Sequence, residues 1–98
     1  MKNLFVIRVT YTKPFEEIEK ILPRHREFLQ SGYKSGNLVA SGPQNPKVGG
    51  IIIGTFSTKD EAESFFKDDP YALESLATYE IIEFSPVLHC DALKEFLK

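Results

Sequence analysis

The sequence predicts an α+β domain in which four strands and two main helices follow the order βαββαβ. Three observations support this fold class: short apolar segments rich in β-branched residues, amphipathic helical stretches between them, and a length of 98 residues that suits one domain. Split βαβ units of this kind form a four-stranded antiparallel sheet with both helices on one face. We expect a single domain over residues 1–98, with a core of about 1–86 and an extension over 87–98.

The first strand is predicted at residues 3–11, because NLFVIRVTY is rich in β-branched and aromatic residues. A helix should follow, since Pro14 suits a first helical turn. Pro23 has no N–H and clashes with the preceding turn, so it should kink this helix or end it and start another. The second helical stretch is expected to close at Gly36 or Asn37.

The middle of the chain supplies two strands and the second main helix. Strands are predicted at 38–42 (LVASG) and at 50–56 (GIIIGTF), where the unbroken isoleucines indicate burial on both faces. The proline- and glycine-rich segment between them is predicted to be a loop. Thr58 and the glutamate three residues later form a capping box that starts the helix. The helix must stop by Asp69, because a residue before proline is pushed out of helical geometry.

The last part of the chain should contain a further helical turn near 71–77 and the fourth strand at 78–84 (TYEIIEF), which Pro86 ends. The segment DALKEFLK at 91–98 is expected to form a terminal helix of two turns. The apolar side of that helix would consist of Leu93, Phe96 and Leu97.

Composition excludes several classes of protein. A chain that is 42% hydrophobic and 27% charged is typical of globular proteins. The net charge of −2 supplies no electrostatic footprint for nucleic acid or anionic lipid, and no apolar run approaches the ~20 residues that span a bilayer. The apolar run in MKNLFVIRVTY is too short for a signal peptide, and the lone Cys90 has no internal disulfide partner. We therefore expect a cytoplasmic protein with no nucleic-acid and no membrane partner.

One face of the predicted sheet carries no helices and needs a cover. Apolar strands such as FVIRV and GIIIG would leave a contiguous apolar surface on that face. A second copy of the same chain is the expected cover, which predicts a homodimer packed through the sheet face.

Two polar residues fall on helix faces that are otherwise apolar. His25 shares its face, at spacings of three and four, with Leu22, Phe28, Leu29 and Gly32. Asp69 continues the stripe of the other helix, which consists of Ala62, Phe65 and Phe66. Both helices should cover the same side of the sheet, so an imidazole and a carboxylate within hydrogen-bonding reach would explain both placements.

Spacing alone leaves structural explanations open for both residues. An aspartate before proline is a common N-cap of a helical turn, which alone would account for Asp69. His25 could equally be a core-edge histidine that bonds a backbone carbonyl or reaches water.

The ordered motifs resemble the YCII-related family of small bacterial proteins. The stretches that carry the resemblance are PRHREFLQSGYKSGNLVASGP, GGIIIGTFSTKDEAESFFKDDPY and YEIIEFSPV, which span nearly the whole chain to about residue 86. Their shared pattern consists of Pro23, His25, Gly36, Gly42, Pro43, Asp69, Pro70 and Tyr71. The resemblance implies a ferredoxin-like fold of the dimeric α/β-barrel group and an active site around the histidine and the aspartate. Members of that wider group include enzymes that isomerise, eliminate from or oxidise ring compounds without a bound cofactor. The tail LHCDALKEFLK runs past the usual end of the family.

Chemistry at the pair would be general acid–base catalysis. Asp69 would fix the tautomer and orientation of the His25 imidazole and stabilise its charged form. This arrangement suits an isomerase- or lyase-type reaction on a small oxygenated ring compound and needs no cofactor. The expected substrate contacts are the backbone N–H groups and hydroxyl of a turn at Ser41, Gly42 and Pro43, the aromatic wall of Tyr71, and Arg8 as an anion partner.

Other functions are weighed against this hypothesis. A non-catalytic module that binds or senses a small molecule with the same pocket stays open, as does a purely structural oligomer. No metal site is expected, because His25, Asp69 and His89 lack ligand-like spacing, and Cys90 is expected to belong to a packing or surface group. RNA-recognition domains share the βαββαβ order, but they stack bases on aromatic residues where the central strands here are mostly aliphatic.

Overall fold

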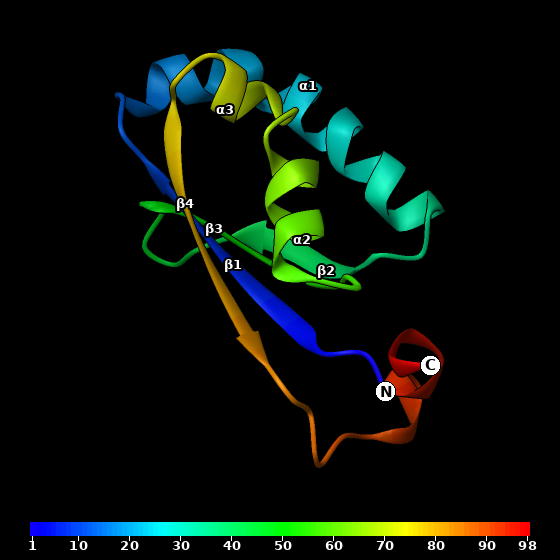
Figure 1. The fold of residues 1–98 in the computed structure, drawn as a ribbon. Helices are drawn as coiled ribbons and strands as arrows, with labels where there is room; N and C mark the ends of the chain where they lie inside the picture. The colour runs from blue at the N-terminus through cyan, green and yellow to red at the C-terminus, as the bar shows by residue number, and fades with distance from the viewer.

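Four antiparallel strands form one sheet in the order β2-β3-β1-β4, and the helices pack on one of its faces (Figure 1). The computed structural model describes residues 1–98. Its elements are β1 (Leu4–Tyr11), α1 (Phe15–Lys34), β2 (Leu38–Pro43), β3 (Gly49–Thr55), α2 (Lys59–Phe66), α3 (Pro70–Leu73), β4 (Ala77–Phe84) and a C-terminal 3₁₀ helix, η1 (Asp91–Leu97). This arrangement confirms the predicted α+β, ferredoxin-like fold with its four-stranded antiparallel sheet.

Between the helices and the sheet lies a single apolar core. Alternate residues of β1 point into it, because successive side chains of a strand face opposite sides of the sheet. The buried members include Phe5, Ile7 and Val9 of β1, Ile18 and Leu29 of α1, and Ala62 and Phe66 of α2. The core thus fixes α1 and α2 against the same face, as the pattern predicted.

The first helical region is one helix, so of the two outcomes expected at Pro23, a kink or an end of the helix, the end is not seen. Helix α1 continues from Phe15 to Lys34 with Pro23 inside it. Proline at this position removes one backbone hydrogen bond. The apolar stripe, however, passes through both halves, and Ile18 before the proline and Leu29 after it are buried in the same core. Tertiary packing therefore keeps the helix continuous, because packing supplies most of the stability of helices in proteins.

Helix α1 ends in a Schellman motif at the predicted place. The N–H of Asn37 donates to the carbonyl of Gly32 at 3.0 Å, and the N–H of Gly36 donates to the carbonyl of Tyr33 at 3.1 Å. Gly36 has a φ of +83°, the left-handed conformation that favours glycine. The reversed chain direction leads straight into β2.

The sheet face without helices carries partly exposed apolar side chains. Ile52 of β3 is buried, whereas Ile51 and Ile53 on this open face are only half-buried. On β4, Ile82 and Phe84 are 43% and 44% exposed. The prediction that the isoleucine run is buried on both faces is therefore not met within one chain, and the homodimer stays a prediction.

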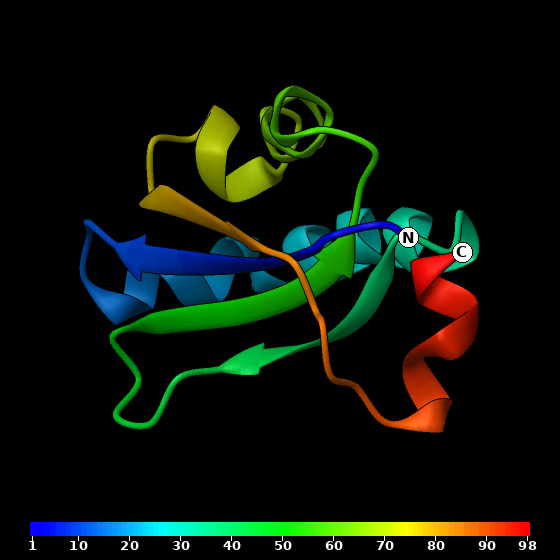
Figure 2. The same ribbon diagram turned by 60° about the horizontal axis from the view of Figure 1, so that its bottom comes forward.

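The C-terminal segment lies beside the N-terminus, away from α3 (Figure 2). The N–H of Lys2 donates to the carbonyl of Leu97 at 2.9 Å, and the Leu97 side chain is buried. The predicted terminal helix is present as a 3₁₀ helix in which Leu93 and Phe96 are half-buried. None of the helices combines the length and the apolar character needed to cross a membrane.

Candidate active site

Asp69 stands between α2 and α3 and caps α3. The carboxylate oxygen Oδ1 accepts a hydrogen bond from the backbone N–H of Tyr71 at 3.1 Å, and the residue is fully buried. The backbone of Asp69 is extended because Pro70 follows it, and Pro70 occupies the first helical position. The interpretation of Asp69 as an N-cap is confirmed.

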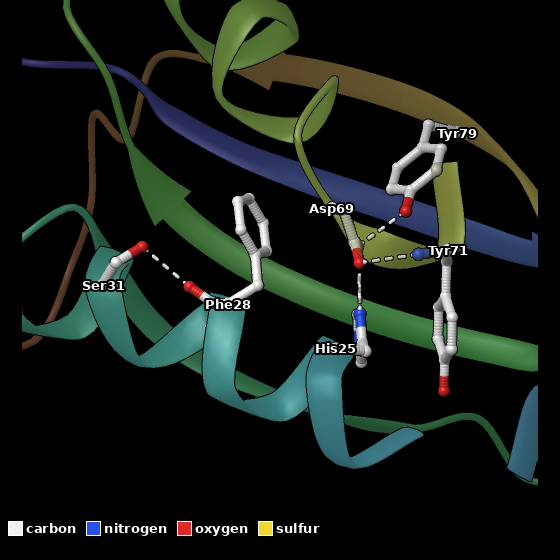
Figure 3. A network of polar contacts seen from close by, with 6 residues as sticks. All are labelled: His25, Phe28, Ser31, Asp69, Tyr71 and Tyr79. Atoms are coloured by element: carbon white, nitrogen blue, oxygen red, sulfur yellow. Dashed lines mark hydrogen bonds and ion pairs between the residues drawn. The ribbon is translucent and has the colours of Figure 1, made fainter. Parts of the chain in front are cut away.

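The same carboxylate pairs with His25 of α1 (Figure 3). The imidazole Nδ1 lies 2.8 Å from Asp69 Oδ1 and 2.9 Å from Oδ2. His25 is 9% exposed and Asp69 is 0% exposed, so the contact is shielded from water. The expectation that the two side chains lie within hydrogen-bonding reach is therefore met, and capping and pairing occur together.

A third donor to the carboxylate comes from Tyr79 of β4. Its hydroxyl donates to Asp69 Oδ2 at 2.6 Å. Sequence reasoning missed this residue, because Tyr79 alternates with Ile81 on the core side of its strand and resembles an ordinary core aromatic. Buried carboxylates are costly unless hydrogen-bonded, and Asp69 receives donors from His25, Tyr71 and Tyr79.

The hydrogen bonds define which imidazole nitrogen is available to a ligand. An ionised carboxylate only accepts hydrogen bonds, so Nδ1 of His25 carries the proton in the bond to Asp69. Nε2 is then the nitrogen left for acid–base chemistry. The Tyr71 ring stacks on the imidazole with centroids 4.0 Å apart and an angle of 10° between the planes. The hydrogen bond and the stacking together restrain the orientation of the His25 ring.

Both tyrosines near the carboxylate stay protonated. Burial raises the pKa of Tyr79, and the hydrogen bond to Asp69 and the carboxylate charge raise it further. Burial also raises the pKa of Tyr71, with smaller contributions from Tyr11 and from the charge of Asp69. At neutral pH each phenol is therefore a hydrogen-bond donor.

A cavity of about 210 Å³ opens beside the imidazole and is lined by His25 and Tyr71. Its apolar walls come from the sheet and from α1, and they include Val9, Leu22, Leu29 and Ile52. An apolar protein cavity of about 150 Å³ holds benzene, so this one has room for a single substituted ring. The cavity can hold a planar ligand against a histidine that a buried carboxylate orients.

Residues 41–43 line the cavity but belong to a strand. The expectation of a turn that offers free N–H groups is wrong, because β2 runs to Pro43 and pairs Ser41, Gly42 and Pro43 with Ile52, Ile51 and Gly50 of β3. A proline is tolerated here because β2 is an edge strand. The Ser41 hydroxyl shares a 2.6 Å hydrogen bond with the Tyr33 hydroxyl.

Arg8 does not reach the cavity, contrary to expectation. It alternates with the buried residues Ile7 and Val9, and it therefore lies on the open face of the sheet. Its Nε lies 3.6 Å from Glu80 Oε1 of β4, and both side chains are largely exposed.

No group of three or more His, Cys, Asp or Glu side chains is arranged to hold a metal ion. His89 and Cys90 are exposed in the tail, where the imidazole Nδ1 of His89 lies 3.0 Å from the carbonyl oxygen of Cys90.

Comparison with known proteins gives one family and two similar solved structures. The profile of the YCII-related domain matches residues 4–85. No curated protein matches the chain. The 5-chloro-2-hydroxyhydroquinone dehydrochlorinase TftG from Burkholderia phenoliruptrix AC1100, in complex with 2,5-dihydroxybenzoquinone, has a TM-score of 0.72 at 17% identity over 84% of this chain and 93% of its own. A variant of SnoaB, a cofactor-independent oxygenase from Streptomyces nogalater, has a TM-score of 0.54 at 18% identity over 92% of this chain and 97% of its own. At these identities the two structures show a shared fold.

Proposed function

The chain belongs to the family of YCII-related domains, and on this premise we propose that it is a cofactor-independent enzyme of small-molecule metabolism. His25 and Asp69 are its acid–base pair, and the reaction is an isomerisation or elimination on a small oxygenated ring compound. The observation that carries the proposal is the buried 2.8 Å bond between His25 Nδ1 and Asp69 Oδ1 at the wall of a ring-sized cavity.

The chemistry follows from the free nitrogen of the pair. Nε2 of His25 takes a proton from a carbon next to a carbonyl or from a phenolic hydroxyl, while Asp69 stabilises the imidazolium through the Nδ1–H bond. In an isomerisation the same nitrogen returns the proton to another atom of the ring. In an elimination the electron pair of the broken C–H bond forms a double bond, and the leaving group departs with its own electron pair.

A positioned base contributes about 10²–10⁴-fold to a rate, so binding groups must supply the remainder. Tyr71 supports this role because its ring holds the imidazole plane and its protonated hydroxyl is a donor in the cavity wall. Ser41, Gly42 and Pro43 complete the proposed binding wall.

The structural neighbours support the substrate class. TftG is a dehydrochlorinase in complex with a dihydroxybenzoquinone, which is a small oxygenated ring, and SnoaB is an oxygenase that works without a cofactor. Both have the fold of this chain, and this fold therefore accommodates chemistry of the proposed kind.

Turnover assays on a panel of hydroxylated, quinonoid and chlorinated single-ring compounds test the proposal. We expect His25→Gln and Asp69→Asn to lose at least about 100-fold in kcat/KM. His89→Gln is the matched control, because it changes the other histidine of the chain, which is exposed in the tail. An unaltered rate in His25→Gln would contradict the assignment of the base. Ligand binding without turnover of any compound would instead support a binding or sensor module that uses the same cavity.

We also propose that the protein is a homodimer through the open sheet face and resides in the cytoplasm. The exposed Ile82 and Phe84 support the dimer, and the single free Cys90 supports the reducing compartment. Sedimentation should give a dimer for the wild type and a monomer for Ile82→Glu. The control is Leu73→Glu, which places the same charge on a 65% exposed leucine of α3. An Ile82→Glu protein that remains a dimer would exclude this interface.

A further inference from the structure

The cavity contains a buried phenol whose hydroxyl has no partner. Tyr71 is 1% exposed, and its hydroxyl forms no hydrogen bond within the protein. The neighbouring Tyr11 also lines the cavity, and its hydroxyl lies close enough to that of Tyr71 for each to shift the other's pKa, but the pair does not meet the geometry of a hydrogen bond. An unpaired buried polar group costs about 1–3 kcal/mol, and such groups are rare in native proteins. An oxygen atom of a ligand in the cavity would provide the missing partner.

Charges around the cavity are of one sign. Arg26 of α1 and Lys47 of the β2–β3 connection line it, whereas no aspartate or glutamate does. The nearby carboxylate, Asp69, is fully buried behind His25 and takes three donors. It therefore does not neutralise the two cations at the cavity rim.

The positions of the two cations suit a ligand that enters with its charge at the rim. Arg26 lies close enough to Tyr11 and Tyr71 for its positive charge to lower the pKa of both phenols. Burial has the larger, opposite effect and raises both pKa values. The Lys47 Nζ lies 5.9 Å from the centre of the Phe15 ring, which also lines the cavity. Both cationic residues are exposed, so they mark the mouth, while the apolar walls lie further in.

We propose that the cavity selects small planar rings that carry a carboxylate or phenolate, with the anion on Arg26 and Lys47 and a ring oxygen accepting a hydrogen bond from Tyr71. This inference rests on the proposed function and names the substrate class of the same site. A guanidinium binds a carboxylate through two parallel charge-assisted hydrogen bonds, which gives orientation as well as affinity. The two cations would also stabilise an oxyanion that develops when His25 removes a proton.

Binding of matched acid and amide pairs tests the inference. The ligands are benzoate, 2-hydroxybenzoate and 2,5-dihydroxybenzoate, each compared with its neutral amide in NMR titrations at low salt. We expect each acid to bind the wild type about tenfold more tightly than its amide, which corresponds to one charge-assisted contact. Arg26→Gln should reduce this preference to below about threefold, and Arg26→Lys should keep part of it.

The matched control is Arg24→Gln, which removes the same charge from the outer face of the same helix, outside the cavity lining. It should keep the full preference for the acid. Tyr71→Phe should weaken the hydroxylated acids about fivefold, since it removes one hydrogen-bond donor. Equal binding of acids and amides, no shift of cavity resonances with any acid, or an equal loss in Arg24→Gln and Arg26→Gln would each overturn the inference.

Failure of the binding inference can be distinguished from failure of the proposed function. A preference for acids without turnover of any compound would support the binding inference and contradict the proposed enzymatic function. Turnover that depends on His25, combined with equal binding of acids and amides, would contradict the binding inference and support the proposed enzymatic function.

Discussion

Replacing Tyr79 by phenylalanine measures how strongly the buried carboxylate depends on its third donor. The change removes the phenolic hydroxyl, which donates to Asp69 Oδ2 at 2.6 Å, and leaves the half-buried ring in place. Hydrogen bonds to charged groups contribute about 1.5–3 kcal/mol, and Asp69 retains the donors from His25 and Tyr71. We therefore expect the free energy of unfolding to fall by about 2 kcal/mol. For a domain of this size, that corresponds to a loss of roughly 8–16 °C in Tm.

Urea denaturation at neutral pH, followed by circular dichroism, measures this loss. The matched control is Tyr33→Phe, which also removes a phenol from a 2.6 Å hydrogen bond, but one between exposed, neutral hydroxyls. We expect that control to lose no more than about 0.5 kcal/mol. In a double-mutant cycle with Asp69→Asn, the two changes should couple, because they alter one network. Equal losses in Tyr79→Phe and Tyr33→Phe would refute the view that Asp69 depends on its tyrosine partner.

Three further outcomes are expected. Gly49→Ala should abolish the fold, because a Cβ at this position would overlap the backbone carbonyl oxygen of Val9. Loss of the far-ultraviolet circular dichroism signal would show this, and a folded variant would contradict the strand register. Gly36→Ala should cost only about 1 kcal/mol in urea, since φ is +83° but no atom stands in the way, and a neutral result would argue against the left-handed turn. Because folding raises the pKa values of Tyr71 and Tyr79, their contribution to the free energy of unfolding should stay constant below about pH 10 and fall at higher pH. Above about pH 10 the unfolded state releases the phenolic protons while the folded state still holds them. Denaturation between about pH 8 and 11 checks the sign, and a flat profile would contradict it.

Periodicity predicted the apposition of His25 and Asp69, but only half of that argument holds. His25 continues the apolar stripe of α1, whereas α2 ends at Phe66 and Asp69 lies beyond it as the extended N-cap of α3. The position of Arg8 followed from the same logic, since alternation with the buried Ile7 and Val9 places it on the other face. Its expected role in anion binding rested on charge alone and ignored this alternation.

Where local rules competed with tertiary contacts, sequence reasoning failed. Proline at position 23 disfavours a helix interior locally, but the buried residues on both sides of it keep α1 intact. The Ser-Gly-Pro stretch at 41–43 has the composition of a turn, but pairing with β3 extends it. The contact of Tyr79 with Asp69 depends on the path from α3 into β4, and no local pattern specifies that path.

Asp69, Pro70 and Tyr71 act as one unit, which explains why the capping and pairing interpretations of Asp69 both hold. Pro70 holds the Asp69 backbone extended, at φ −62° and ψ 129°, so that the carboxylate turns back onto the N–H of Tyr71. The cap thereby aims the remaining lone pairs at His25 and Tyr79, while the following ring stacks on the imidazole. An alanine at position 69 would remove the cap and the pair together. Asparagine keeps an oxygen for the Tyr71 N–H and removes the charge, so Asp69→Asn separates the carboxylate's effect on His25 from its part in starting α3.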